Sequence, residues 1–214
     1  MTPKSIFFDL DGTLTDSGEG IFNCAELALR HFGLPIPTRQ EMRVFVGPPL
    51  RDTFAKFGVP ADGIETAMEV YRSRYNTIGL FENTPYPGIR DLLETLKADG
   101  HKLYVATSKP ESMAVRILEK FDLAKYFDII CGATFDKSRD CKEAVIAYLL
   151  EQTGNDRRAI MVGDTAFDVI GAKAHGIPTI GVAWGYGKVE DMVCAGAAAI
   201  ADNPNDLHRL LTGF

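Results

Sequence analysis

The stretch Ile6-Phe7-Phe8-Asp9-Leu10-Asp11-Gly12-Thr13 joins a short apolar run to a turn that is rich in Asp and Gly. An uninterrupted apolar run is typical of a strand that is buried on both faces, as in a parallel sheet. The polar residues after such a strand lie at its carboxyl end, where open α/β sheets bind their ligands. The stretch therefore predicts both a type of sheet and the edge of the sheet that carries chemistry.

Further apolar runs follow along the chain, and amphipathic segments lie between them. The runs are residues 103–106, 127–130, 159–162, 178–182 and 197–200. In the segment 89–96, Ile and Leu stand at i, i+3, i+4 and i+7, and Gly100 is well placed to end that helix. Alternation of strand and helix predicts an α/β fold with right-handed crossovers, in which a doubly wound, mainly parallel, Rossmann-like sheet forms the centre.

One region interrupts this alternation. Between residues 17 and 82 we find no convincing buried strand, but helical patterns cover 22–32, 50–57 and 64–75. The Pro- and Gly-containing stretch 83–88 is typical of a linker that returns to the sheet. We therefore expect an α/β core domain made of residues 1–16 and 83–214, with residues 17–82 inserted as an all-helical cap domain.

The composition is that of a folded globular protein, with 46% hydrophobic and 24% charged residues among 214. The formal net charge of −6 argues against nucleic acid and anionic lipid as partners, because both need a basic surface. We find no signal-like or membrane-spanning run, and the four cysteines form no Cys-x-x-Cys pair. These features predict a cytoplasmic protein, a monomer or small homo-oligomer, that binds neither nucleic acid nor membranes.

Polar side chains follow three of the predicted strands. In chain order they are Asp9 and Asp11, Thr107 and Ser108, and Asp164 and Asp168. A single Asp after a strand is usually a turn former or a helix cap, but three strand ends with matching chemistry favour a functional site. Clustered carboxylates repel one another unless a cation lies among them, and oxygen ligands suit Mg²⁺ rather than zinc.

These segments resemble the motifs of the haloacid dehalogenase-like phosphatases. Residues 7–17 are similar to the first motif, 105–110 to the second and 162–168 to the fourth, and 171–177 are similar to the usual continuation. The resemblance is strongest to phosphoglycolate phosphatase-like and 5′-nucleotidase-like members with a small helical cap of the C1 type. It implies a Mg²⁺-dependent phosphatase whose partner is a small phosphorylated metabolite, either phosphoglycolate or a nucleoside 5′-monophosphate.

The resemblance also implies roles for individual residues. Asp9 would attack phosphorus and form an aspartyl-phosphate, and Asp11 would act as the general acid and base. Thr107 would hydrogen-bond the phosphoryl group. Mg²⁺ would be held by Asp9, Asp164 and the main-chain carbonyl of Asp11, with Asp168 either a ligand or a residue that orients one.

The third motif needs a lysine, and two lysines compete for that place. Lys142 fits the nucleotidase-like pattern better than Lys137, and neither is part of the Lys-Pro pair common in phosphoglycolate phosphatases. The candidates for substrate binding are Gly12, Thr13, Ser108 and Arg51. Arg51 follows a rigid turn and could reach a substrate carboxylate or second phosphate, or it could be a surface arginine beside Asp52.

Other functions use a similar fold. A sugar-phosphate mutase, such as β-phosphoglucomutase, shares the core residues and differs in how water is admitted. A non-enzymatic regulator on the same fold could lose Asp9 or Asp11 without unfolding. Both residues are present here, which argues against a regulator. A dinucleotide-binding oxidoreductase needs Gly-x-Gly-x-x-Gly after the first strand. The glycines in 181–187 do not have that spacing, and we interpret them as a loop near the rim of the cleft.

Overall fold

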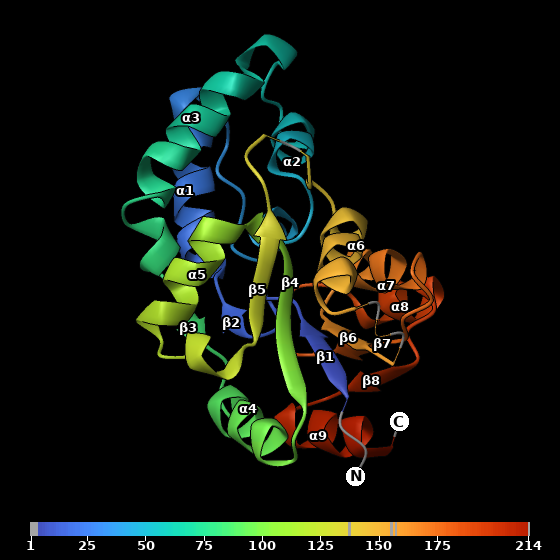
Figure 1. The fold of residues 1–214 in the computed structure, drawn as a ribbon. Helices are drawn as coiled ribbons and strands as arrows, with labels where there is room; N and C mark the ends of the chain where they lie inside the picture. The colour runs from blue at the N-terminus through green and yellow to red at the C-terminus, as the bar shows by residue number, and fades with distance from the viewer. Residues whose placement is uncertain (1–3, 137, 155, 157, 214) are drawn as a thin grey trace. The chain divides into compact units, whose positions relative to one another are not determined.

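The computed structural model describes residues 4–136, 138–154, 156 and 158–213. The chain divides into two compact units, an α/β unit of residues 1–15 and 85–214 and a helical unit of residues 16–84 (Figure 1). The predicted cap, residues 17–82, falls inside the helical unit. Two short strands, β2 (Thr15–Asp16) and β3 (Thr84–Pro85), pair with each other where the chain passes from one unit to the other.

The α/β unit is built on a six-stranded sheet in which all neighbouring strands are parallel. The order is β5-β4-β1-β6-β7-β8. The strands are β1 (Ser5–Phe8), β4 (Lys102–Pro110), β5 (Ile129–Ala133), β6 (Ile160–Gly163), β7 (Thr179–Val182) and β8 (Ala199–Ala201). This confirms the α/β fold with a doubly wound parallel sheet that the sequence predicts.

The central strand β1 sets the position of the predicted chemical groups. Phe8, its last residue, lies beside Val105 of β4 and Val162 of β6. The chain therefore leaves β1 and β6 at nearly the same level of the sheet, next to the point where β4 reaches Ala106 and Thr107. Strands β4 and β5 lie on one side of β1 and β6 to β8 on the other, so this edge is the switch point at which open α/β sheets bind ligands.

Helices cover both faces of the sheet. They are α4 (Ile89–Ala98), α5 (Glu111–Lys120), α6 (Lys142–Gln152), α7 (Ala166–Lys173), α8 (Val189–Ala195) and α9 (Pro204–Gly213). Figure 1 shows α5 on one side of the sheet and α6, α7 and α8 on the other. Under α6, Val145 and Leu149 are fully buried in one cluster with Phe7 and Met161. Each such side chain contributes about 1.5–3 kcal/mol through burial.

Two of the strand limits that differ from the sequence prediction lie in β5 and β4. Strand β5 starts at Ile129 rather than at residue 127, because residues 124–126 form a 3₁₀ turn and Phe127 N–H donates to the Ala124 carbonyl. Strand β4 continues to Pro110 instead of ending at Ala106, with a shift of register against β5 between Thr107 and Pro110. The residues expected to follow this strand therefore belong to it.

The helical unit contains α1 (Gly18–His31), α2 (Leu50–Lys56) and α3 (Ile64–Tyr75), with 3₁₀ turns at Glu41–Phe45, Ala61–Gly63 and Gly79–Phe81. The helices agree closely with the three helical patterns of the sequence. Aromatic rings fill the space between them: Phe54 lies edge-on to Phe45 and to Tyr71, with ring centroids 5.3 and 6.2 Å apart. A core of its own lets this unit fold as a compact body.

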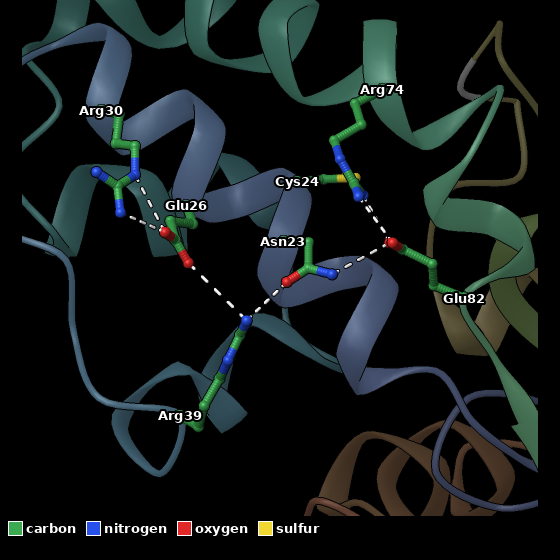
Figure 2. Close-up of polar contacts among 7 residues, drawn as sticks. All are labelled: Asn23, Cys24, Glu26, Arg30, Arg39, Arg74 and Glu82. Carbon is green, nitrogen blue, oxygen red and sulfur yellow. Dashed lines mark hydrogen bonds and ion pairs between the residues drawn. The ribbon is translucent and has the colours of Figure 1, made fainter.

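Polar contacts tie the helices of this unit to its loops (Figure 2). Arg74 of α3 binds both carboxylate oxygens of Glu82, at 2.6 and 2.7 Å. The side chain of Asn23 in α1 donates to Glu82 and accepts from Arg39. Glu26 of α1 accepts hydrogen bonds from Arg30 and lies 3.9 Å from Arg39. We call the six residues Asn23, Glu26, Arg30, Arg39, Arg74 and Glu82 the helical-unit network.

Among the described residues, no helix has the length and apolar character that crossing a membrane requires.

Candidate active site

Asp9 is the first residue after β1. Its N–H donates to the carbonyl of Val162 at 2.9 Å, which continues the pairing of β1 with β6 by one residue. The residue is 9% exposed. Burial raises the pKa of the Asp9 carboxyl from 3.8 to about 6 against the opposing effect of Lys142, and the charges of Asp168 and Asp11 act in the same direction as burial.

The chain turns sharply after Asp9. The carbonyl of Leu10 accepts hydrogen bonds from the N–H groups of Thr13, Leu14 and Thr15. Gly12 has a φ of +86°, and a Cβ at this position would lie 2.2 Å from Asp164 Oδ2. Only glycine combines this conformation with so close an approach. The Gly in this motif therefore brings the turn after β1 against the residue that follows β6.

Asp164 follows β6 and is fully buried. Its carboxylate accepts hydrogen bonds from the Thr13 hydroxyl at 3.3 Å and from the Tyr186 N–H at 2.8 Å. Burial raises the pKa of Asp164 from 3.8 to about 8, and the charges of Asp168 and Asp9 act in the same direction. A carboxyl group in this state gains stability from a cation that lies close to it.

Lys142 is the first residue of α6 and is buried. Its Nζ lies 2.8 Å from Asp9 Oδ1, 2.8 Å from Asp168 Oδ1 and 2.9 Å from the Ala106 carbonyl oxygen. Burial acts to lower the pKa of this ammonium, but the charges of Asp168 and Asp9 outweigh it and raise the pKa. Lys137, the competing lysine, lies outside the described residues.

Asp168 is one helical turn beyond Asp164 and has no exposed surface. Its Oδ2 accepts hydrogen bonds from the Thr165 N–H and hydroxyl, at 3.0 and 2.8 Å, and its Oδ1 is paired with Lys142. Both oxygens are therefore engaged by the protein. This arrangement favours Asp168 as a residue that orients Lys142, whereas the sequence analysis considered Asp168 as a ligand of the ion or as a residue that orients one.

Asp11 faces a lysine that the sequence analysis did not single out. Lys109 Nζ lies 2.8 Å from Asp11 Oδ2, and the lysine side chain is only 6% exposed. The other oxygen of Asp11 is buried and accepts no hydrogen bond from the described residues. The sequence contained a signal for this residue, because Lys109 belongs to the 105–110 stretch that resembles the second motif.

Of the remaining predicted residues, two lie in strand β4 and one lies in the helical unit. Thr107 is buried in β4, where its hydroxyl accepts the Lys109 N–H at 3.2 Å, whereas Ser108 is exposed. Arg51 belongs to the helical unit, in α2, and its guanidinium pairs with Glu65 of α3. The structure thus gives Arg51 a partner other than the neighbouring Asp52, and its role in substrate binding stays a prediction.

The charges at this edge of the sheet are unbalanced. One ligand oxygen from each of Asp9, Asp164 and Asp168 lies within 4.8 Å of the others. Among the described residues, Lys142 is the ammonium paired with this group, so three carboxylates face one positive charge. We call these four residues the carboxylate cluster. The candidate ligands of the three aspartates are all oxygen atoms, which fits Mg²⁺, and a divalent ion would offset the excess negative charge.

Comparisons with known proteins agree with this chemistry. The model of the family described as "Haloacid dehalogenase-like hydrolase" matches residues 6–182. Tyrosine-protein kinase PtkA of Mycobacterium tuberculosis is 43% identical over 190 residues, which are 88% of this chain and 65% of that protein. The chain therefore spans less than two thirds of the length of PtkA.

Other relatives match along nearly their whole length. A 5′-nucleotidase of Pseudomonas aeruginosa is 38% identical, over 92% of this chain and 93% of its own. A phosphoglycolate phosphatase of Aquifex aeolicus is 33% identical, over 97% and 96%. A crystal structure described as a predicted phosphatase from Clostridium acetobutylicum superposes with a TM-score of 0.94 at 39% identity, covering 100% of both chains.

Proposed function

The chain belongs to the haloacid dehalogenase-like hydrolases. On this premise we propose that it is a phosphoric monoester hydrolase, a Mg²⁺-dependent phosphatase that cleaves a small phosphate monoester through an aspartyl-phosphate on Asp9. The carboxylate cluster is the observation that carries this proposal. It combines a carboxylate at the end of the central strand with an ammonium 2.8 Å away and a second buried carboxylate, Asp164.

Two aspartates perform the bond changes in this proposal. The carboxylate of Asp9 attacks phosphorus, the bond from phosphorus to the ester oxygen breaks, and Asp11 protonates that oxygen as it leaves. Asp11 then takes a proton from water, whose oxygen attacks the phosphorus of the aspartyl-phosphate. This second step releases inorganic phosphate and restores the free Asp9 carboxylate. Lys109, 2.8 Å from Asp11, holds the carboxylate of Asp11 in place.

Neighbouring groups stabilise the negative charge on the transferring phosphoryl group. Lys142 supplies a positive charge beside Asp9, and Thr107 supplies a hydroxyl from the adjacent strand. Asp168 keeps Lys142 oriented toward Asp9. Gly12 and Thr13 lie in the turn after β1 and are the remaining core candidates for contact with the phosphoryl oxygens, together with the exposed Ser108.

Mg²⁺ fits the residues of this site. Asp9, Asp164 and the main-chain carbonyl of Asp11 would hold it, and a cation would offset the burial and carboxylate repulsion that raise the pKa values of Asp9 and Asp164. When bound, the ion supplies positive charge against the phosphoryl oxygens. The protein's own contribution is to place the ligands rigidly through the turn after β1 and the end of β6.

The relatives suggest the class of substrate. A nucleoside 5′-monophosphate is our first choice, because the 5′-nucleotidase of Pseudomonas aeruginosa is more similar to this chain than the phosphoglycolate phosphatases, at 38% against 33% identity. Phosphoglycolate is the second. The helical unit would act as the cap that selects between them, with Arg51 as its candidate contact to a second anionic group.

The similarity to PtkA supports a second candidate function. An aspartyl-phosphate can pass its phosphoryl group to an alcohol instead of water, and PtkA is 43% identical to this chain. The candidate is therefore phosphoryl transfer to a tyrosine hydroxyl, which needs a nucleoside triphosphate as donor. It is distinguished from hydrolysis by the fate of the phosphoryl group.

We also propose the setting in which the enzyme works. It would be a cytoplasmic monomer or small homo-oligomer that acts on a small phosphorylated metabolite, and the formal net charge of −6 supports the absence of nucleic acid and anionic membranes as partners.

The test is phosphate release from a panel of monoesters, with and without Mg²⁺, for the wild type and Asp9→Asn. Asp62→Asn, which changes an exposed aspartate of the helical unit, is the matched control. We expect hydrolysis of a nucleoside 5′-monophosphate or phosphoglycolate that requires Mg²⁺, is lost in Asp9→Asn and is kept in Asp62→Asn. A parallel incubation with labelled ATP and a tyrosine peptide tests the second candidate.

Four outcomes would change the assignment. Undiminished hydrolysis by Asp9→Asn would exclude Asp9 as the nucleophile. Label on the peptide without hydrolysis of any monoester would favour phosphoryl transfer. If the wild type isomerises a sugar phosphate but releases no phosphate, the mutase is the correct interpretation, and a chain inactive in every assay would point to a regulator.

A further inference from the structure

The loop after β7, residues 183–187, lies against the turn after β1. The indole N–H of Trp184 donates to the carbonyl of Thr13 at 3.1 Å. Farther along the loop, the N–H groups of Tyr186 and Gly187 point at Asp164 Oδ2, at 2.8 and 3.4 Å. The hydroxyl of Thr13 donates to the other oxygen of Asp164. The carboxylate of Asp164 is thus held by the loop and by the turn, and Trp184 joins the loop to the turn.

The backbone of the loop touches the site directly. A Cβ at Gly185 would lie 2.4 Å from Asp164 Oδ2 and 2.4 Å from the carbonyl oxygen of Gly12. Such distances leave no room for a side chain. The base of the loop is fixed to the sheet, because Ala183 N–H donates to the Ala201 carbonyl at 2.9 Å. The loop therefore contacts Asp164, a proposed ligand of the ion, and the turn after β1 from an anchored position.

Trp184 is itself held in place. The half-buried indole lies edge-on to the ring of Tyr86, with centroids 6.5 Å apart and planes at 63°. The N–H of Tyr86 donates to the Leu14 carbonyl at 3.1 Å, one residue beyond the carbonyl that Trp184 binds. Two hydrogen bonds and an aromatic contact therefore fix the turn at Thr13 and Leu14 from one side.

We propose that Trp184 is a positioning residue for the cation site. Its indole N–H fixes the carbonyl of Thr13, which sets the turn that carries Asp11 and the Thr13 hydroxyl against Asp164. Mg²⁺ requires nearly ideal octahedral placement of its ligands, so a loosened turn weakens its binding. This inference rests on the proposed function, in which Asp164 holds Mg²⁺.

The composition supplies a direct reporter. Trp184 is the only tryptophan of the 214 residues, so all indole fluorescence comes from this loop. If the loop and the cation site are coupled as we propose, binding of Mg²⁺ to the unmodified protein changes the indole emission. This readout needs neither a mutation nor turnover.

The experiment measures Mg²⁺ affinity by calorimetry in three proteins. They are the wild type, Trp184→Phe, and a protein that carries 3-benzothienylalanine at position 184, in which sulfur replaces the indole N–H and the fused rings are kept. The last is the matched control for packing. We expect Mg²⁺ binding about three- to tenfold weaker in both altered proteins, as for the loss of one hydrogen bond. Their melting temperatures should change little. In the wild type, the indole emission should change in a saturable way as Mg²⁺ binds.

The outcomes separate this inference from the proposed function. If the wild type binds Mg²⁺ and hydrolyses a monoester while the benzothienyl protein has wild-type affinity, Trp184 serves only in packing and the inference is wrong. If Trp184→Phe does not fold, the Mg²⁺ affinity of the benzothienyl protein alone tests the inference. A wild type that binds no Mg²⁺ overturns both proposals together.

Discussion

The two units of this chain each contain a polar cluster, and the two clusters differ in charge balance. In the helical-unit network, Arg74 and Glu82 form a bidentate ion pair. This pairing lowers the pKa of Glu82 and raises that of Arg74. In the carboxylate cluster the shifts of the carboxyl groups run the other way, and burial raises the pKa of both Asp9 and Asp164.

The difference has a physical reason. A carboxylate with a matched partner is more stable ionised, whereas buried carboxylates with too few positive neighbours are destabilised in that form. The helical-unit network is complete within the protein and serves the fold. The carboxylate cluster is incomplete, and an added cation would complete it. The carboxylate cluster, which is buried and has excess negative charge, is thus the group to associate with function.

The largest expected effect comes from removing the ammonium of the carboxylate cluster. Lys142→Met should lower turnover at saturating Mg²⁺ by about 100- to 1,000-fold, because a preorganised charge beside the phosphoryl group is lost. Lys97→Met, which breaks a part-exposed pair with Asp128 in the same unit, is the matched control and should leave turnover unchanged. Steady-state phosphate release measures both. A fully active Lys142→Met would remove the lysine from the mechanism.

A second expected effect is on stability as a function of pH. Between about pH 4 and pH 8 the unfolded chain loses protons from Asp9 and Asp164 that the folded, cation-free chain keeps, since the folded pKa values are about 6 and about 8. The free energy of unfolding without a cation should therefore fall as the pH rises through this window. Mg²⁺ favours the ionised carboxylates, so its stabilising effect should grow over the same range.

Thermal melts at about pH 5, 6.5 and 8, each with and without Mg²⁺, check this dependence. At a hundredfold excess over the dissociation constant the ion should contribute about 2.7 kcal/mol. Equal stabilisation by Mg²⁺ at the lowest and highest pH would show that its binding does not involve these two carboxyls.

A smaller effect is expected when the Arg74–Glu82 pair of the helical-unit network is broken. Glu82→Gln leaves the Arg74 guanidinium without its carboxylate, and both side chains are only 24% exposed. The free energy of unfolding should fall by about 1–2 kcal/mol, measured by urea denaturation, while Mg²⁺ affinity stays at the wild-type value. A loss of Mg²⁺ affinity without a loss of stability would mean that the two clusters do not divide structure and function as we infer.

The smallest effect belongs to the exposed part of the same network. Arg30 pairs with Glu26 one helical turn away, and its side chain is 63% exposed. Arg30→Ala should change the free energy of unfolding by no more than about 0.5 kcal/mol, because water and salt screen such pairs. A cost as large as that of Glu82→Gln would show that the network acts as one cooperative unit.

The sequence predicted the groups whose position follows from strand register. Asp9 and Asp164 each follow a short apolar run, and parallel strands bring such ends to one edge. The helical patterns between residues 17 and 82 agree with α1, α2 and α3, because side-chain periodicity reports directly on helices.

Other contacts could not be predicted, for two reasons. Lys109 reaches Asp11 because β4 continues past Ala106 with a shifted register, and no residue pattern marks such an irregularity. The loop after β7 holds Asp164 through main-chain N–H groups, whose direction residue types do not encode. The glycines of 181–187 placed a loop near the cleft but did not indicate which carboxylate it binds.

Calorimetric titration with Mg²⁺ tests the central claim most directly, that the carboxylate cluster is completed by a cation. We predict one ion per chain, with protons released at about pH 7, where Asp164 is still largely protonated, and little release at about pH 9.5. Binding should be lost in Asp164→Asn and kept in Glu82→Gln. Absence of binding by the wild type, or binding that Asp164→Asn leaves unchanged, would contradict the account.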